Sequence, residues 1–312
     1  MKLRAYRDVE DYWRLRTFLR ETIQLYGHRE VNWHVARLDY WWWFANPCLE
    51  KLAPERHIFV WELEDGTLAG AINPEGPGQA FWQVHPAYKT AAFEDELLAA
   101  AEDSLAVPGR AGGQRLQVFC DSQDRARQQL LAQHGYARLE KPDAHEVQHR
   151  RRLDAPLPER PEIPGYTIRA LGAGLELLER CYASGLGFHN DDIQTARENR
   201  DQPAWYHCIQ AAPLYRRDLD LVAVAGDGAI AAFCTTWFDD VSRTAYIEPV
   251  ATVPAHRRRG LGRALLLEGL LRLQQMGCKT AFVSGYSQAA NGLYFDVMGP
   301  EHDTLETWEK EW

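Results

Sequence analysis

The densest cluster of residues that could do chemistry is a basic loop that contains two glycines. It reads Arg257-Arg258-Arg259-Gly260-Leu261-Gly262-Arg263 and lies between a predicted strand and a predicted helix. The first turn of a helix presents unbonded backbone N–H groups and the positive end of the helix dipole. Glycine lets a ligand approach the backbone closely, and the arginines supply positive charge. The pattern therefore predicts a cradle for a pyrophosphate, with a solvated basic turn as the alternative.

The same loop argues against two common phosphate sites. It lacks the Gly-Lys-Ser/Thr ending of nucleotide-hydrolysing loops and the Gly-x-Gly-x-x-Gly spacing that binds nicotinamide dinucleotides. The net charge of the chain is −9, from 44 acidic and 35 basic residues. This balance disfavours nucleic acid as a partner and favours a neutral or cationic substrate.

The elements that position the loop can be predicted from residue patterns. We expect a strand over residues 245–253 and a helix over 261–276, whose leucines form one broad apolar face. A further strand over 279–284 and a further helix over 289–298 follow. Mixed strands and helices in this order predict an α/β (α+β) domain with helices covering a sheet.

The chain reads as two copies of such a domain. Asp154 to Pro164 carries four prolines in eleven residues, which favours an extended linker. Val84-His85-Pro86 in the first half resembles Thr252-Val253-Pro254 in the second, and the order of predicted elements repeats. We therefore predict domains over residues 1–153 and 165–312, joined by the linker 154–164.

The second half resembles the GNAT superfamily of N-acetyltransferases. The resemblance rests on the stretch from Ile247 to Pro254, on Arg257-x-x-Gly260-x-Gly262, and on Asn291-Gly292-Leu293-Tyr294. It is strongest over residues 245–299 and faint over the first half. It implies two tandem GNAT-like domains, each with a mixed, mostly antiparallel sheet flanked by helices. The layout, with one degenerate copy, is similar to that of tandem chains such as mycothiol synthase.

The resemblance implies acetyl-CoA as cosubstrate and gives roles to several residues. Backbone groups of Val250, Ala251 and Thr252 would pair with the pantetheine arm. The pyrophosphate would be held by Arg257 and by the backbone of the next six residues, Arg258, Arg259, Gly260, Leu261, Gly262 and Arg263. Asn291 belongs to the second family motif. Tyr294 would protonate the departing thiolate. The family spacing to Gly299 would favour Phe295, but Phe295 has no hydroxyl and Asn291 fixes the register on Tyr294.

Glu248 is the preferred general base. It lies two and four residues before Val250 and Thr252, so on a regular strand the three would share a face. Pro249 removes one ladder donor and predicts a bulge. A carboxylate beside an apolar cleft suits removal of a proton from an ammonium group. The alternative is a strand glutamate that faces solvent.

The first half lacks this equipment. Alignment of Pro86 with Pro254 places Lys89 opposite Arg257, Ala92 opposite Gly260 and Glu94 opposite Gly262. A carboxylate at that point would repel a pyrophosphate. We therefore expect the first half neither to bind CoA nor to catalyse.

One motif suggests different chemistry. His145-Glu146-Val147-Gln148-His149 matches the His-Glu-x-x-His pattern of zinc peptidases, which needs both histidines on one helix face. The context favours a strand, in which residues four apart lie about 13 Å apart, too far to share a metal. We expect no metal, with a zinc metallopeptidase through His145, Glu146 and His149 as a remote alternative.

Composition sets the remaining expectations. Apolar residues make up 46% of the chain without a run long enough to span a membrane, and the N-terminus lacks an apolar signal region. These features predict a cytoplasmic protein with no membrane partner. The acceptor is expected to be a small-molecule or peptide amine, for which Asp191 and Asp192 are candidate contacts unless they cap a helix. The amine's identity and the oligomeric state stay open, and a non-catalytic CoA-binding or sensor module is the alternative function.

Overall fold

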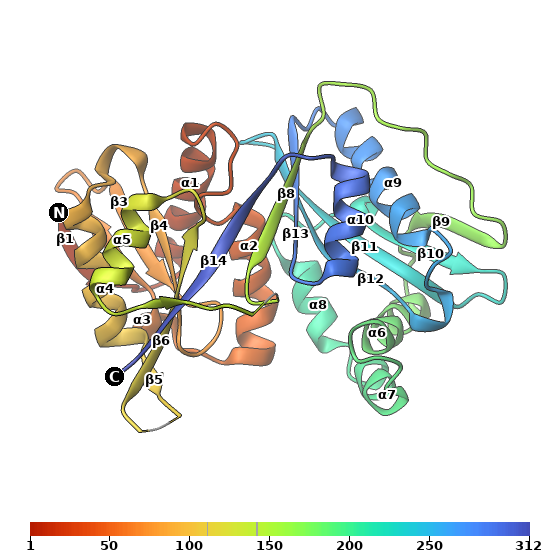
Figure 1. Ribbon diagram of the computed structural model, residues 1–312. Coiled ribbons are helices and arrows are strands. Elements are labelled where there is room, and N and C mark those ends of the chain that lie inside the picture. The colour runs from red at the N-terminus through yellow and green to blue at the C-terminus, as the bar shows by residue number, and fades with distance from the viewer. Residues whose placement is uncertain (111, 142) are drawn as a thin grey trace. The chain divides into compact units, whose positions relative to one another are not determined.

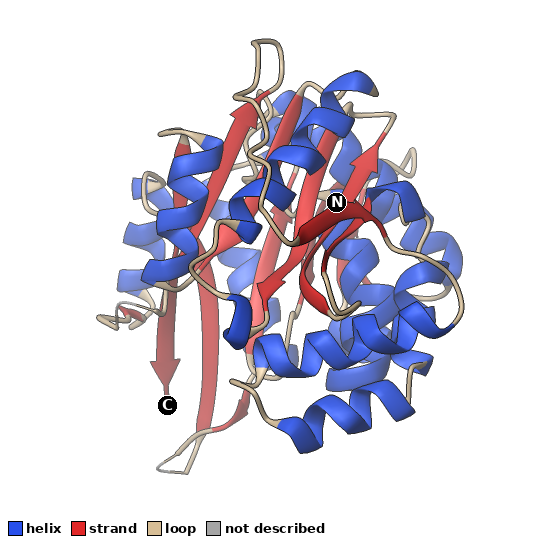
Figure 2. Ribbon diagram, turned by 90° about the vertical axis from the view of Figure 1, so that its right-hand side faces the viewer, coloured by secondary structure: helices blue, strands red, loops and turns tan. Residues whose placement is uncertain are grey.

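The computed structural model describes residues 1–110, 112–141 and 143–312 and contains two compact units. The first unit consists of Met1–Gln148, Gly285–Gln288 and His302–Trp312. The second consists of His149–Ser284 and Ala289–Glu301. Each unit has a central sheet flanked by helices (Figures 1 and 2).

The first unit is built on strands β1 to β4, which pair in order as antiparallel neighbours. Strand β4 then pairs in parallel with β6, and β6 pairs antiparallel with β14. The strands are β1 (Lys2–Ala5), β2 (Phe59–Glu62), β3 (Leu68–Asn73), β4 (Gln79–Val84), β5 (Val107–Pro108), β6 (Gln114–Asp121), β7 (Ala137–Arg138) and β14 (His302–Glu311). The helices are α1 (Val9–Leu25), α2 (Val35–Tyr40), the π-helix η1 (Trp41–Glu50), α3 (Pro54–His57), the 3-10 turn η2 (Pro86–Tyr88), α4 (Ala91–Leu105) and α5 (Arg125–Gln133).

The second unit repeats this order. Strands β9 to β12 are antiparallel neighbours, and β12 pairs in parallel with β13. The strands are β9 (Tyr166–Ala170), β10 (Asp220–Ala225), β11 (Ile230–Asp239), β12 (Thr244–Thr252) and β13 (Thr280–Gly285), while β8 (Glu146–Arg152) begins in the first unit and ends in the second. The helices are α6 (Leu175–Phe188), α7 (Ile193–Asp201), α8 (Ala204–Ala211), η3 (Arg217–Leu219), η4 (Pro254–His256), α9 (Leu261–Gln275) and α10 (Gln288–Met298).

The two units do not coincide with the ranges 1–153 and 165–312. Strand β14 lies in the first unit because it forms a long antiparallel ladder with β6, from Leu305↔Asp121 to Glu311↔Arg115. The proline-rich segment 154–164 contains no helix or strand and lies within the second unit, where Leu157 and Ile163 pack on the core. Contacts distant in sequence therefore set the division.

Helices cover both faces of the second unit's sheet. The apolar face of α9 packs on β11, where a Cβ at Gly269 would lie 3.1 Å from Thr236 Oγ1. Helix α6 packs on the opposite face, where a Cβ at Gly187 would lie 3.1 Å from the Cβ of Ala251. The two glycines thus let α9 and α6 approach the strands closely, and this close packing fixes both helices on the sheet that contains β12. No described helix is both long and apolar enough to cross a bilayer.

Candidate functional site

Strands β12 and β13 separate beside the basic loop. Their parallel ladder covers Thr244↔Thr280, Ala245↔Ala281 and Tyr246↔Phe282 and then stops. Strand β12 continues to Thr252, and among the described residues its ladder partner from Ile247 onward is β11 alone. This geometry leaves one edge of β12 open to an extended ligand.

The hydrogen-bond pattern shows which backbone groups face the open edge. Val253 N–H donates to Ala231 O at 2.9 Å, and bonded pairs alternate along an antiparallel ladder. Ala251 is therefore bonded to β11, whereas the backbone groups of Val250 and Thr252 point toward the open edge. Of the three residues predicted for a pantetheine arm, these two have the required backbone direction.

The predicted bulge is present. Cys234 pairs with Val250 and Thr236 pairs with Ile247, so Glu248 and Pro249 together lie opposite Thr235. Because one extra residue breaks the alternation, the argument that Glu248 shares a face with Val250 and Thr252 no longer holds. The Glu248 backbone is instead fixed by Trp237, whose Nε1 donates to the Glu248 carbonyl at 2.6 Å.

The basic loop leads into α9 with its backbone donors unused. Gly260 is the N-cap, with φ +84° and no side-chain cap, and the first helical bond runs from Ala264 N–H to Gly260 O at 3.0 Å. No backbone N–H from Arg258 to Arg263 donates to another residue of the described chain. Arg258 also has a positive φ of 62°, and such alternating backbone forms an anion-binding concavity. The loop and helix start thus supply six consecutive donors.

The arginine side chains have different tasks. Arg257 is turned back onto the protein, with Nε 3.1 Å from Thr252 O and Nη2 3.2 Å from Gly187 O. Arg259 Nη1 donates to the Tyr166 hydroxyl at 3.0 Å, and Arg263 Nε donates to Asp296 Oδ2 at 2.7 Å. These contacts brace the loop, while the Arg258 side chain is exposed.

The two glycines also differ in role. Gly260 has the left-handed backbone that favours glycine. A Cβ at Gly262 would lie 2.9 Å from Leu293 Cδ2, so glycine there lets α10 pack against the first turn of α9. Leu261 is 1% exposed and anchors that turn in the core.

Tyr294 lies on α10 at the edge of the same core. It is 7% exposed, whereas Phe295 is 40% exposed, so α10 turns Tyr294 rather than Phe295 inward. Burial is the main reason that the pKa of Tyr294 is raised above its usual value, with smaller effects of Cys234 and Glu248 in the same direction. Both of these groups lie on strands β11 and β12, and the phenol stays protonated near neutral pH.

His149 is a neighbour that sequence reasoning missed. Its ring packs edge-on against Tyr294 with centroids 5.6 Å apart, and its Nε2 lies 3.1 Å from Asn291 Oδ1. The Asn291 carboxamide therefore orients this histidine against the tyrosine. The only sequence signal at His149 was the His-Glu-x-x-His match, which pointed to the wrong chemistry.

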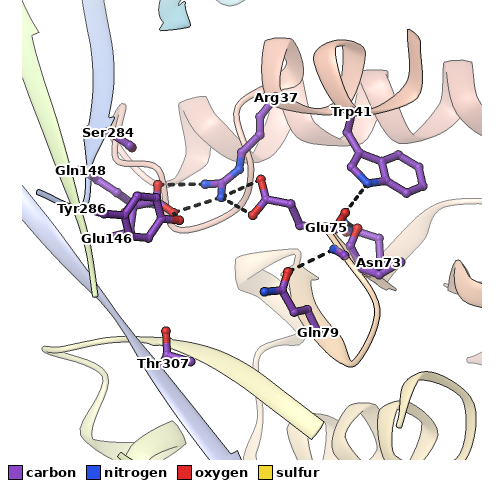
Figure 3. A network of polar contacts seen from close by, with 12 residues as sticks. Arg37, Trp41, Asn73, Glu75, Gln79, Glu146, Gln148, Ser284, Tyr286 and Thr307 are labelled. Carbon is purple, nitrogen blue, oxygen red and sulfur yellow. Dashed lines mark hydrogen bonds and ion pairs between the residues drawn. The ribbon is translucent and has the colours of Figure 1, made fainter. Parts of the chain in front are cut away.

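The zinc alternative is wrong. Glu146 and His149 lie on β8, a strand, and not on a helix. Glu146 is buried and bound by Arg37 at 2.9 and 3.0 Å and by the Tyr286 hydroxyl at 2.9 Å (Figure 3). His145 Nδ1 accepts from Thr307 N–H at 3.3 Å. No group of three or more metal-ligating side chains occurs among the described residues.

The equivalent edge in the first unit is closed by the chain itself. Asn32 Nδ2 donates to Val84 O at 3.1 Å, and Asn32 Oδ1 accepts from Val84 N–H at 2.9 Å. The backbone N–H of the next residue, His85, donates to Ala69 O, just as the backbone N–H of Val253 donates to Ala231 O. His85 therefore corresponds to Val253, and Val84 corresponds to Thr252. The side chain of Asn32 thus occupies both backbone groups of Val84, whereas in the second unit Arg257 bonds the carbonyl of Thr252 and no side chain of the described residues bonds its N–H.

The helix start in the first unit is closed as well, and the alignment at this point needs correction. Helix α4 begins after Thr90, whose Oγ1 accepts from Phe93 N–H at 3.2 Å, so Thr90 and not Ala92 stands at the position of Gly260. The loop before it is shorter than that before α9. Glu94 does not face a ligand, because Arg127 binds it in the interior at 2.6 Å.

One member of the acidic pair near α7 is a helix cap. Asp192 is the N-cap of α7 and accepts from Gln194 and Thr195 N–H at 3.0 and 3.2 Å, as in the helix-cap alternative. Asp191 is exposed, with a positive φ of 64°. The sequence pattern is therefore explained by local structure.

Residues 176–299 match the family model described as the acetyltransferase (GNAT) family. No curated protein matches the chain by sequence. Among solved structures, a GCN5-related N-acetyltransferase from Sphaerobacter thermophilus is 18% identical with a TM-score of 0.64, covering 99% of this chain and 95% of that one. A tandem GNAT protein from the clavulanic acid biosynthesis pathway is 14% identical with a TM-score of 0.61, covering 99% and 98%. A GNAT-family acetyltransferase from Colwellia psychrerythraea is 12% identical with a TM-score of 0.58 and full coverage of both chains. These structures show that the whole chain has the fold of GNAT proteins.

Proposed function

We propose that the second unit transfers an acetyl group from acetyl-CoA to an amine, because residues 176–299 match the family model described as the acetyltransferase (GNAT) family. The observation that carries the proposal is the run of unbonded backbone donors from Arg258 to Arg263 at the start of α9, beside the open edge of β12. A pyrophosphate and an extended amide-containing arm match these two features.

The backbone binds and orients the thioester. Donors at the start of α9 hold the pyrophosphate, and the outward groups of Val250 and Thr252 bond the pantetheine amides as a neighbouring strand would. The acetyl carbonyl is then directed toward the bulge at Glu248 and Pro249, where the ladder is interrupted. This arrangement turns the reaction with a bound amine into an oriented, effectively intramolecular step.

Two side chains handle the protons. Glu248, directly or through water, accepts the proton that the ammonium group of the acceptor must lose before it can attack. The amine forms a bond to the acetyl carbon, and the carbon–sulfur bond breaks. Tyr294 donates its phenolic proton to the departing thiolate, for which a buried, neutral phenol is suited.

The cysteines favour direct transfer without an acyl-enzyme. Cys234, which pairs with Val250, and Cys278, which follows the far end of α9, are both buried, and burial raises the pKa of each thiol to about 12. Thiolates are the nucleophilic form, so neither is activated near neutral pH. The amine acceptor itself is the nucleophile.

The test is release of free CoA thiol from acetyl-CoA in the presence of a panel of amines. The proposal predicts amine-dependent thiol release with one N-acetylated product per thiol. Binding of CoA without turnover on any amine would favour the sensor alternative, and absence of CoA binding would refute the site. Addition of a chelator is expected to leave the rate unchanged.

A further inference from the structure

A buried arginine of the second unit has no hydrogen-bond partner. Arg180 on α6 is 0% exposed, and its Nε, Nη1 and Nη2 all lack a partner in the described chain. Its guanidinium lies 3.4 Å from the ring centroid of Phe233 and 4.9 Å from that of Tyr206. A buried guanidinium with unused donors is unfavourable unless an anion completes it.

The nearby carboxylate does not fill this role. Asp220 on β10 accepts from the Tyr206 hydroxyl at 2.7 Å, from the Tyr215 hydroxyl at 2.8 Å and from Thr235 Oγ1 at 3.1 Å. Its oxygens are therefore occupied by hydroxyl groups. The negative charge of Asp220 balances Arg180 only at longer range.

The first unit shows how this chain pairs a structural arginine. Arg16 on α1 is similarly buried, but Asp39 binds it in a fork, with distances of 2.8 and 3.0 Å. Arg127 is likewise bound by Glu94. The unused donors of Arg180 thus differ from the pattern of the other buried arginines described here.

Arg180 also lies next to the proposed transfer site. Arg180, Ser184 and Gly187 follow helical spacing on α6, so they lie on one face of the helix. Phe233 contacts both ends of this face, because a Cβ at Gly187 would lie 3.7 Å from its ring. Phe233 is paired with Ala251 of β12, and Arg257 of the basic loop donates to Gly187 O. The face therefore begins beside the open edge of β12 and runs two turns away from it.

We propose that Arg180 and Ser184 bind a carboxylate of the acceptor, so that preferred acceptors are amines that also carry a carboxylate. The inference deepens the proposed acetyl transfer and rests on it. Ser184, one turn from Arg180, is 7% exposed and adds a hydroxyl donor. A planar carboxylate matches the in-plane donors of a guanidinium whose face is stacked on Phe233. A single negative charge also suits one arginine beside Asp220 better than a phosphate dianion.

The carboxylate reaches Arg180 from the Phe233 side. Phe233 has no polar group to fix its ring, whereas the Tyr206 hydroxyl is bound to Asp220. Phe188, whose ring centroid lies 5.8 Å from that of Phe233, is 51% exposed. Phe233 is itself 0% exposed, so the proposal requires these two rings to turn aside before an acceptor carboxylate reaches Ser184 and Arg180.

The first arm of the test compares acceptors that differ only in a carboxylate, namely lysine with cadaverine and tyrosine with tyramine. The wild-type protein is expected to prefer the carboxylate member by about 10-fold or more in kcat/KM. Arg180→Met is expected to reduce this preference to about threefold or less, mainly through KM, and Arg180→Lys to retain part of it. O-phosphoethanolamine tests whether a phosphate can replace the carboxylate. The proposal would be overturned if wild type and Arg180→Met showed the same preference for the carboxylate-bearing amine, or if wild type used O-phosphoethanolamine better than the carboxylate-bearing amines.

The second arm separates binding from structure. Arg180→Met is expected to keep or raise the melting temperature, because it removes a buried charge without a partner, whereas the matched Arg16→Met leaves Asp39 unpaired and lowers it. N-acetyl-lysine is expected to raise the melting temperature of wild type but not of Arg180→Met. If no amine is acetylated yet this shift depends on Arg180, the subsite stands and the proposed function fails. If the shift is absent or independent of Arg180, the subsite is refuted.

Discussion

Asn32 bonds both backbone groups of Val84, donating to its carbonyl at 3.1 Å and accepting from its N–H at 2.9 Å. Val84 corresponds to Thr252, whose backbone faces the open edge of β12. A side-chain amide of the first unit thus takes the place that we assign to a pantetheine amide in the second. Both units of the duplicated fold keep a pair of parallel strands that separate. The strand edge exposed by this separation is covered by Asn32 in the first unit and is open to a ligand in the second.

The first prediction is one CoA site per chain. Calorimetric titration with CoA should give one site, because Asn32 and the Thr90 cap close the first unit. Gly260→Val should weaken binding at least about 10-fold, since a β-branched residue is strained at φ +84° and distorts the donors.

Gly228→Val is the matched control. Gly228 has a similar φ of 90° in the β10–β11 turn, with no atom near its Cβ position. The Gly228→Val variant should have a lower melting temperature but an unchanged affinity for CoA. Two sites per chain, or equal loss of affinity in both variants, would contradict the assignment.

The second prediction concerns the general acid. Tyr294→Phe should lower kcat by about 10- to 1,000-fold and leave CoA affinity nearly unchanged, because proton donation acts only in the transition state. Adding Phe295→Tyr should not restore the rate, since Phe295 is 40% exposed and packs on the edge of the His149 ring, with centroids 4.5 Å apart, outside the core cluster that holds Tyr294. Restoration would show that the family spacing to Gly299 identifies the acid. Because burial raises the pKa of Tyr294, the wild-type rate should show no alkaline loss from this group up to about pH 10.

The third prediction concerns the general base. In the wild type, kcat/KM should fall toward acid pH as Glu248 becomes protonated. Glu248→Gln should lower the plateau and remove this acid limb. Glu198→Gln, on α7 and away from β12, serves as the control. An unchanged pH profile in Glu248→Gln would indicate solvent as the base, with orientation supplying the catalysis.

The fourth prediction concerns the thiols. Burial raises the pKa of Cys120, Cys181, Cys234 and Cys278 from 9.0 to about 12. A thiol reagent at pH 8 should therefore modify only Cys48 and Cys208 rapidly in the folded protein, and all six cysteines after unfolding.

The same pKa shifts make stability depend on pH. Because the pKa values of these buried thiols are raised in the folded state, the contribution of the thiols to stability is present below pH 9 and is lost between about pH 9 and 12. A labelled thioester on any cysteine during turnover would refute direct transfer.

The sequence predicted local features of the site well. The start of α9 after Gly260, the end of α10 before Gly299 and the bulge at Pro249 all follow from the conformational limits of glycine and proline. These residues act on their immediate neighbours, so their effects can be read without tertiary structure.

Features that depend on distant contacts were missed or misplaced. The pairing of Asn32 with Val84 joins residues 52 positions apart, and no local pattern marks it. Glu94 was expected to repel a pyrophosphate, because no local pattern shows that Arg127 on another helix binds it in the interior. Strand β14 was assigned to the second domain because sequence order does not reveal its ladder with β6. The absence of a partner for Arg180 likewise becomes visible only in the folded chain.

The most direct test of the central claim is a crystal structure of the protein with CoA bound. The account predicts the pyrophosphate on the backbone N–H groups between Arg258 and Arg263, and pantetheine amides on Val250 and Thr252. It predicts the CoA sulfur within about 4 Å of the Tyr294 hydroxyl, the range of a thiol hydrogen bond. CoA bound in the first unit, or a sulfur far from Tyr294 with the pyrophosphate in place, would contradict it.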